Sequence, residues 1–188
     1  MGIEAVFIDR DGVLNRYVKD DYIRTPDEVH LIEGSARAVR LLNDAELPVI
    51  VISNQQGVGK RIMTEDALDQ VDGEIRDQLL TASNAKLTHV YYCVHLASDN
   101  CDCRKPKPGM LLQAADEHGI DLANSVMIGD SLGDIATGIA AGVAETILLM
   151  SGATSIISPT ALEARMRPTL IARDLLGAVK HLLENLDK

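Results

Sequence analysis

Short apolar runs alternate along the chain with segments in which apolar residues recur at helical spacing. The apolar runs indicate strands, most clearly the β-branched run LPVIVIS, which is typical of a strand buried on both faces. The expected strands cover residues 4–8, 47–53, 88–95, 125–130 and 145–150. The expected helices cover residues 35–45, 63–83, 108–119, 134–143 and about 174–187.

Capping residues support two of these helices. Thr64 is a candidate N-cap before a first turn that contains acids, and Pro108 and Gly119 stand at the start and end of another helix. Alternating strands and helices favour an α/β fold, a mostly parallel sheet flanked by helices. We expect one domain over residues 1–188, with the last helix covering the sheet. Residues 151–168 are rich in Ser, Thr, Pro and Gly and are predicted to form a loop or short excursion.

Composition narrows the classes of partner. The chain has 188 residues, a net charge of -10, four Tyr, one Phe and no Trp. The net negative charge and the few aromatic rings argue against nucleic-acid binding. No apolar stretch approaches the roughly 18 residues of a membrane span and no secretory signal is visible, so we expect a cytoplasmic protein. The sequence does not show the oligomeric state, and we favour a monomer. An anionic ligand would need a few local cations.

Acidic residues follow two of the predicted strands. Asp9 and Asp11 come after the first strand, and Asp130 and Asp134 follow the fourth. Taken alone, the segment DRDG is consistent with a simple turn. Because ligands bind at the carboxyl ends of strands in such sheets, the acids are expected to meet, and like charges need a cation between them. Hard oxygen ligands favour magnesium.

Polar and basic residues follow the second and third predicted strands. Ser53 and Asn54 supply a hydroxyl and an amide after the second strand, a weak signal by itself. Arg104, Lys105 and Lys107 lie between prolines in a loop after the third strand. A basic loop is usually only solvated, but prolines restrict this one. Facing the acids, a lysine there would hold a phosphate and offset charge during phosphoryl transfer.

The strongest local signal contains all three cysteines of the chain. Cys93 and His95 are two residues apart, and Cys101 and Cys103 repeat that spacing after a five-residue gap. An odd number of cysteines excludes a closed set of disulfides within one chain. Three thiolates and an imidazole favour tetrahedral zinc, and four protein ligands leave no open position. We therefore predict a structural zinc loop over residues 93–103; the alternative is coincidental buried thiols beside a core histidine.

Together these segments resemble the haloacid dehalogenase (HAD) superfamily phosphatases. The chain is similar to the small group without a large cap domain that contains D,D-heptose 1,7-bisphosphate phosphatases and histidinol phosphatases. The matching segments run in order from about residue 6 to about residue 149: FIDRDGVL, VISNQQG, CVHLASDNCDCRKPKPGM and MIGDSLGDIATG.

The resemblance implies a Rossmann-like HAD fold and assigns roles to the residues above. It implies that Asp9 attacks phosphorus to form an aspartyl phosphate, and that Asp11 protonates the leaving oxygen and later activates water. Magnesium would be held by Asp9, the backbone carbonyl of Asp11 and Asp130, with Asp134 in support. The remaining implied roles are phosphoryl binding by Ser53 and Lys105, substrate binding by Asn54 and Arg104, and zinc binding by Cys93, His95, Cys101 and Cys103.

The substrate implied by the resemblance is a small phosphorylated metabolite. The five-residue gap in the zinc loop resembles histidinol phosphatases, whereas RKPKPGM and RYVKDDYIRTPDEVHLIEG resemble the heptose enzymes. We favour the heptose 1,7-bisphosphate, cleaved at the 7-phosphate. A second phosphate needs another cation, for which the candidates are Arg16, Lys19, Arg24, Lys60, Arg61 and Lys107. The rivals are histidinol phosphatase, a polynucleotide 3′-phosphatase and a catalytically idle zinc-braced module that senses a metabolite.

Overall fold

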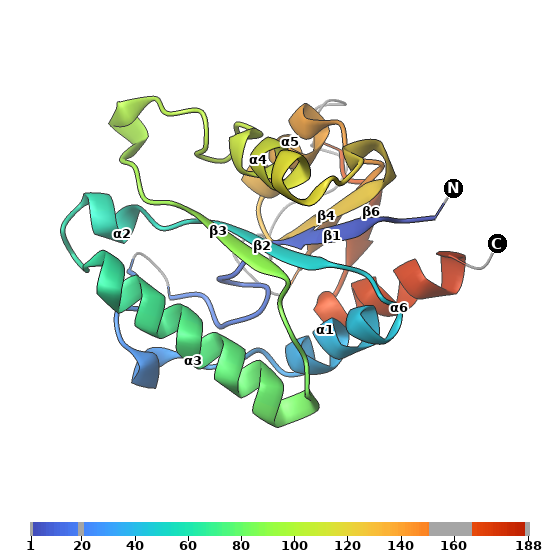
Figure 1. The fold of residues 1–188 in the computed structure, drawn as a ribbon, viewed down its shortest axis with the longest axis horizontal. Helices are drawn as coiled ribbons and strands as arrows, with labels where there is room; N and C mark the ends of the chain where they lie inside the picture. The colour runs from blue at the N-terminus through green and yellow to red at the C-terminus, as the bar shows by residue number, and fades with distance from the viewer. Residues whose placement is uncertain (1, 19–20, 151–166, 187–188) are drawn as a thin grey trace.

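A six-stranded parallel sheet forms the centre of the computed structural model, which describes residues 2–18, 21–150 and 167–186. The strand order is β3-β2-β1-β4-β5-β6, and every adjacent pair is parallel (Figure 1). The strands are β1 (Ala5–Ile8), β2 (Val49–Asn54), β3 (His89–Cys93), β4 (Ser125–Gly129), β5 (Glu145–Leu149) and β6 (Leu170–Ala172).

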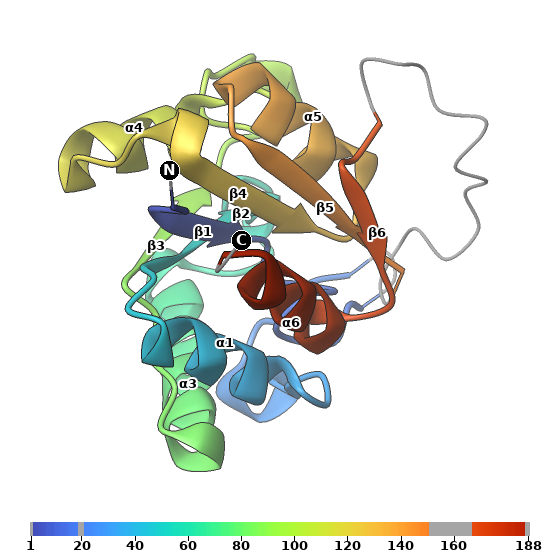
Figure 2. The same ribbon diagram turned by 90° about the vertical axis from the view of Figure 1, so that its right-hand side faces the viewer.

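Helices cover both faces of this sheet, as Figure 2 shows. One face carries α1 (Ser35–Asp44), α3 (Glu65–Ser83) and α6 (Leu175–Leu186), and the other carries α4 (Gly109–His118) and α5 (Leu132–Ala141). The short elements are α2 (Gln56–Gly59), η1 (Pro26–Glu28), η2 (Ala97–Asp99) and η3 (Leu122–Asn124). Each face has its own apolar cluster, and β1 contributes to both because successive side chains point to opposite faces. The predicted α/β fold is confirmed.

The caps lie where the sequence predicts them. The Thr64 side chain accepts a hydrogen bond from the backbone N–H of Ala67 at 3.1 Å and so begins α3. Gly119 ends α4 in the left-handed conformation at φ +65°, which a residue without Cβ adopts without strain. Pro108 stands at the N-cap of α4, one position before the helix.

Besides the short 3-10 helices η1, η2 and η3, two elements were not predicted. The strand β6 has only three residues, which are apolar but not fully buried, so its run is shorter than those that mark the other strands. The four-residue helix α2 follows β2 at a place where the sequence predicted no helix. Most of the predicted excursion, residues 151–166, lies outside the described residues. In the part of the chain that is described, no helix combines the length and hydropathy needed to cross a bilayer.

Candidate active site

A cavity of about 540 Å³ opens at the carboxyl ends of β1, β2 and β4. Strand ends in parallel sheets leave such a crevice because the chain departs into helices on opposite faces. Seven of the predicted site residues line it: Asp9, Asp11, Ser53, Asn54, Lys105, Asp130 and Asp134. The structure therefore brings together residues that are separated by up to 125 positions, 134 minus 9, in the sequence.

Three carboxylates and one lysine form the floor of the cavity. Asp9, Asp130 and Asp134 each offer an oxygen within 4.8 Å of the others. The Lys105 ammonium lies 2.9 Å from Asp9 Oδ1 and 2.6 Å from Asp134 Oδ1, and it also donates to the Ile52 carbonyl at 3.0 Å. With all three carboxylates ionised and the lysine protonated, the cluster has a net charge of about -2, which one divalent cation would neutralise.

Two glycines allow the acids to approach this closely. Gly12 has φ +87°, and a Cβ there would stand 2.0 Å from Asp130 Oδ2. A Cβ at Gly129 would stand 2.2 Å from the Cβ of Asp134. Any side chain at either position would push an acid out of place, so the glycine of the DRDG segment is required by its contact across the sheet as well as by its turn.

The first turn of α5 orients Asp134. Ser131 caps this helix and donates from its hydroxyl to Asp134 Oδ2 at 2.6 Å, while the Ser131 backbone N–H donates to the same oxygen at 3.1 Å. This capping box occupies one carboxylate oxygen and leaves Oδ1 for Lys105. The acid is therefore held by local helix geometry before any ligand binds.

Burial and neighbouring charge shift the pKa values of the central pair. Burial raises the pKa of Asp9 to about 7; Lys105 opposes the shift, whereas Asp134 and Asp130 add to it. Burial by itself lowers the pKa of Lys105, but the carboxylates of Asp134 and Asp9 outweigh it and raise that pKa. A cation among the carboxylates would favour the ionised form of Asp9.

Asp11 is held by a separate set of donors that sequence reasoning missed. Arg10 donates from Nε to Oδ1 at 3.1 Å and from Nη2 to Oδ2 at 2.8 Å, and Gln55 donates to Oδ2 at 2.8 Å. Asn15 adds a long contact of 3.5 Å. The signal for Arg10 in the sequence is a charged residue directly after a buried strand, between two acids.

The two polar residues of β2 differ in what they contact. Ser53 lines the cavity and accepts from Gln55 at 3.1 Å. Asn54 donates to the Lys105 carbonyl and accepts from the Lys105 backbone N–H, both at 3.1 Å. Asn54 thus clamps the backbone of Lys105 to the sheet. Arg104 is not among the residues that line the cavity, and its substrate contact stays a prediction.

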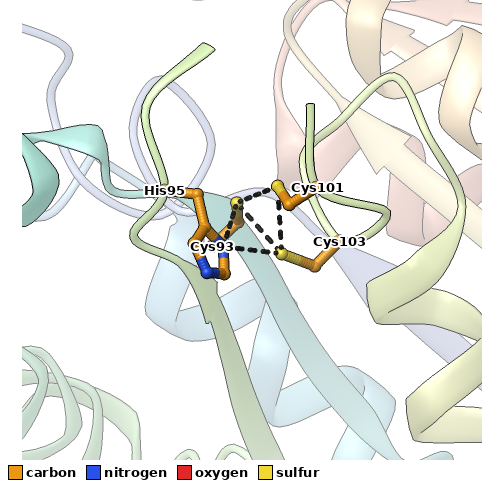
Figure 3. Close-up of side chains that lie close together, drawn as sticks. All are labelled: Cys93, His95, Cys101 and Cys103. Carbon is orange, nitrogen blue, oxygen red and sulfur yellow. Dashed lines mark hydrogen bonds between the residues drawn. The ribbon is translucent and has the colours of Figure 1, made fainter. Parts of the chain in front are cut away.

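The zinc-loop residues Cys93, His95, Cys101 and Cys103 converge beside the third strand (Figure 3). Their sulfur atoms lie 3.2 to 3.6 Å apart, and His95 Nδ1 lies 3.2 Å from Cys103 Sγ and 3.7 Å from Cys93 Sγ. Zn–S and Zn–N bonds of about 2.3 and 2.0 Å at tetrahedral angles place ligand atoms about 3.5 to 3.8 Å apart. The three cysteines are free thiols, so this geometry suits a metal.

Burial and crowding change the acidity of the thiols. Burial first, then hydrogen bonds and charge from Cys93 and Cys101, raise the pKa of Cys103 to about 12. A thiol with that pKa stays protonated at neutral pH unless a cation displaces the proton. The loop leads directly to Lys105, which is two residues beyond Cys103.

The basic residues that were candidates for binding a second phosphate lie in different parts of the structure. Lys60 lines the cavity and lies 5.5 Å from the centre of the Tyr22 ring. Lys107 instead faces the zinc loop, where it donates to the Asn100 carbonyl at 2.9 Å. Lys19 lies outside the described residues. Among the described residues that line the cavity, Lys60 and Lys105 are the cations.

Comparisons of the chain with a family model, with related proteins and with a solved structure agree with this site. Residues 102–178 match the HAD-hydrolase-like family model. The chain is 36% identical over 155 residues to the D-glycero-beta-D-manno-heptose-1,7-bisphosphate 7-phosphatase of Pasteurella multocida, covering 79% of this chain and 83% of that protein. It is 38% identical over 135 residues to the protein of that name from Pseudomonas aeruginosa, covering 72% and 75%. The crystal structure of D,D-heptose 1,7-bisphosphate phosphatase from B. bronchiseptica, complexed with magnesium and phosphate, superposes with a TM-score of 0.87 at 27% identity, covering 97% and 99%.

Proposed function

Since the chain belongs to the family of HAD-like D-glycero-beta-D-manno-heptose-1,7-bisphosphate 7-phosphatases, we propose that it removes the 7-phosphate from that heptose bisphosphate. The observation that carries the proposal is the buried Lys105 bridging Asp9 and Asp134 beside Asp130 at the carboxyl edge of the sheet. This arrangement supplies a nucleophile, a cation and a metal-binding surface to one phosphoryl group.

The reaction proceeds in two displacements. The Asp9 carboxylate attacks phosphorus and the bond from phosphorus to the sugar oxygen breaks, while Asp11 gives its proton to that oxygen. An aspartyl phosphate remains on Asp9. Asp11, now ionised, takes a proton from water as the water oxygen attacks phosphorus, which frees Asp9 and releases inorganic phosphate. Ser53 and Lys105 bind the phosphoryl oxygens throughout.

The acids around Asp9 fit magnesium. Asp9, the backbone carbonyl of Asp11 and Asp130 would hold the ion, with Asp134 in support, and the charge deficit of the cluster suits a divalent cation. Bound magnesium would offset the negative charge of the phosphoryl group during transfer. The sulfur and imidazole ligands of the 93–103 loop fit structural zinc instead.

The cysteines bear on the compartment in which the protein works. Free thiols at Cys93, Cys101 and Cys103 suit a reducing compartment such as the cytoplasm. We propose that the protein acts as a monomer, because the proposed reaction needs no residue from a second chain.

Lys60 is the residue best placed to bind the second phosphate. We expect Lys60→Ala to raise KM for the heptose bisphosphate about 10- to 100-fold with little change in kcat, because a hydrogen bond to a charged group contributes about 1.5 to 3 kcal/mol. Steady-state kinetics on the bisphosphate and on the 7-monophosphate measure the effect, and the monophosphate should be unaffected. Lys86→Ala, an exposed lysine at the opposite end of the sheet, is the matched control. An equal change on both substrates would place Lys60 elsewhere.

Substrate choice is tested by kcat/KM on three compounds under the same conditions. These are the two anomers of the heptose 1,7-bisphosphate and histidinol phosphate. The short zinc-loop spacing is the observation that favours the histidinol alternative. We expect either anomer to exceed histidinol phosphate by at least about 10²-fold, since a site that binds a second phosphate loses that contact with histidinol phosphate. A preference for histidinol phosphate would overturn the substrate assignment and leave the phosphatase chemistry intact.

A further inference from the structure

Arg10 is a buried arginine between the two acids that perform the reaction. Its side chain is 1% exposed. Its backbone N–H donates to Asp9 Oδ1 at 2.7 Å, while its guanidinium pairs with Asp11. One residue therefore contacts the proposed nucleophile through its main chain and the proposed acid/base through its side chain.

The donors around Asp11 fix the rotation of its carboxylate. Oδ2 accepts two short bonds of 2.8 Å, from Arg10 Nη2 and from Gln55. Oδ1 accepts from Arg10 Nε at 3.1 Å and has only the long contact to Asn15 in addition. Arg10 Nε also donates to Oδ2 at 3.2 Å, so the shorter and more numerous bonds fall on Oδ2 and the longer ones on Oδ1. Two parallel bonds from a rigid guanidinium also define the plane of the group.

The guanidinium has its own support. It lies over the Tyr92 ring, 5.5 Å from the centroid, and the Tyr92 hydroxyl donates to Asp72 at 3.1 Å. Burying such a charge pair is costly, and apolar residues of similar size often serve stability as well or better. Stability alone therefore does not account for an arginine here, whereas the need to orient Asp11 does.

We propose that Arg10, assisted by Gln55, is a positioning residue that holds the Asp11 carboxylate in the orientation required for proton transfer. The inference rests on the proposed function, in which Asp11 protonates the leaving oxygen. It adds that the acid is oriented by a buried side chain that does not line the cavity. Loss of that orientation would hinder cleavage most where the leaving oxygen depends on the proton.

The leaving group separates this role from a purely structural one. An alkyl phosphate such as the sugar phosphate needs its leaving oxygen protonated, whereas 4-nitrophenyl phosphate releases a stable anion that needs little help. We expect Arg10→Met to lower kcat/KM for the sugar phosphate about 10²-fold and for 4-nitrophenyl phosphate less than about 10-fold. Equal losses on the two substrates in a folded variant would overturn the proposal.

A double-mutant cycle provides the second readout. If Arg10 acts through Asp11, then adding Arg10→Met to Asp11→Asn changes kcat/KM less than about twofold further. A full additional loss would contradict that coupling. Arg40→Met removes the same group from an exposed pair with Asp44 and should leave both substrates unaffected.

The proposal can still be tested if Arg10→Met does not fold. Should Arg10→Met fail to fold, Gln55→Leu removes the other short bond to Oδ2 and should shift the ratio between the two substrates in the same direction. An unchanged ratio there would overturn the proposal. A wild-type protein that hydrolyses neither substrate would instead overturn the proposed function, so the two failures are distinct.

Discussion

Replacing Asp9 with asparagine is expected to abolish phosphate release, lowering kcat by at least about 10³-fold, because loss of a covalent nucleophile removes the whole two-step route. Asparagine has nearly the same shape, so Lys105 keeps its bond to Asp134 and the cavity keeps its form. Release of inorganic phosphate from the heptose bisphosphate measures the loss. Mass spectrometry of the purified variant excludes deamidation back to aspartate, which would otherwise imitate residual activity.

The same substitution should not reduce stability in the absence of metal. In the folded protein the pKa of Asp9 is raised to about 7 from an ordinary 3.8. Between those values the unfolded chain releases the proton more readily, so ionisation of Asp9 lowers the stability of the fold as pH rises from about 4 to 7. Asparagine removes that penalty, and the Tm of metal-free Asp9→Asn at pH 8 should equal or exceed that of the wild type.

Controls separate these two effects. Asp44→Asn, on the exposed end of α1, should change neither kcat nor Tm appreciably. Phosphate release by Asp9→Asn at the wild-type rate would rule out the proposed nucleophile. A large fall in Tm would show that Asp9 stabilises the acid cluster, contrary to the direction of its pKa shift.

The fold could be predicted because its signals are local. The strands β1, β2 and β4 are buried on both faces, so each contains a run of consecutive apolar residues in the sequence. Thr64 and Gly119 are read directly from capping chemistry. The strand β6 was missed because three residues, of which Ile171 is exposed, are too few to show a periodicity, and only pairing with β5 makes them a strand.

The site was predicted as far as residue type and strand-end position indicate function. Asp9, Asp130 and Lys105 meet as expected because parallel strands end at one edge. Contacts that depend on side-chain direction were not readable. Arg10 turning back to Asp11, and Lys60 rather than Lys107 reaching the cavity, follow from packing that no spacing in the sequence encodes.

The zinc loop is connected directly to Lys105, the lysine proposed to bind the phosphoryl group. The chain passes from Cys103 through Arg104 to Lys105, whose backbone is clamped by Asn54 and whose ammonium bridges Asp9 and Asp134. Without metal, that segment would lose the attachment at its Cys103 end. Loss of zinc should therefore affect turnover, although no zinc ligand is part of the proposed chemistry.

Cys103→Ser is the variant that tests this connection most directly. We expect about one zinc per wild-type chain by elemental analysis, and loss of most of it in the variant. If the metal contributes about 4 kcal/mol, the Tm falls by about 8 to 16 °C for a chain of this length. A displacement of Lys105 by about 1 Å would lower kcat/KM about 10²-fold.

Two comparisons decide what such losses mean. Ser98→Ala lies in the same loop and removes only a 3.5 Å contact with Asp99, so its zinc content, Tm and kcat/KM should match the wild type. Wild-type values of Tm and kcat/KM in zinc-free Cys103→Ser would contradict a structural metal. A fall in kcat/KM at temperatures well below the lowered Tm would show that zinc acts on turnover by placing Lys105, since the fold itself is then intact.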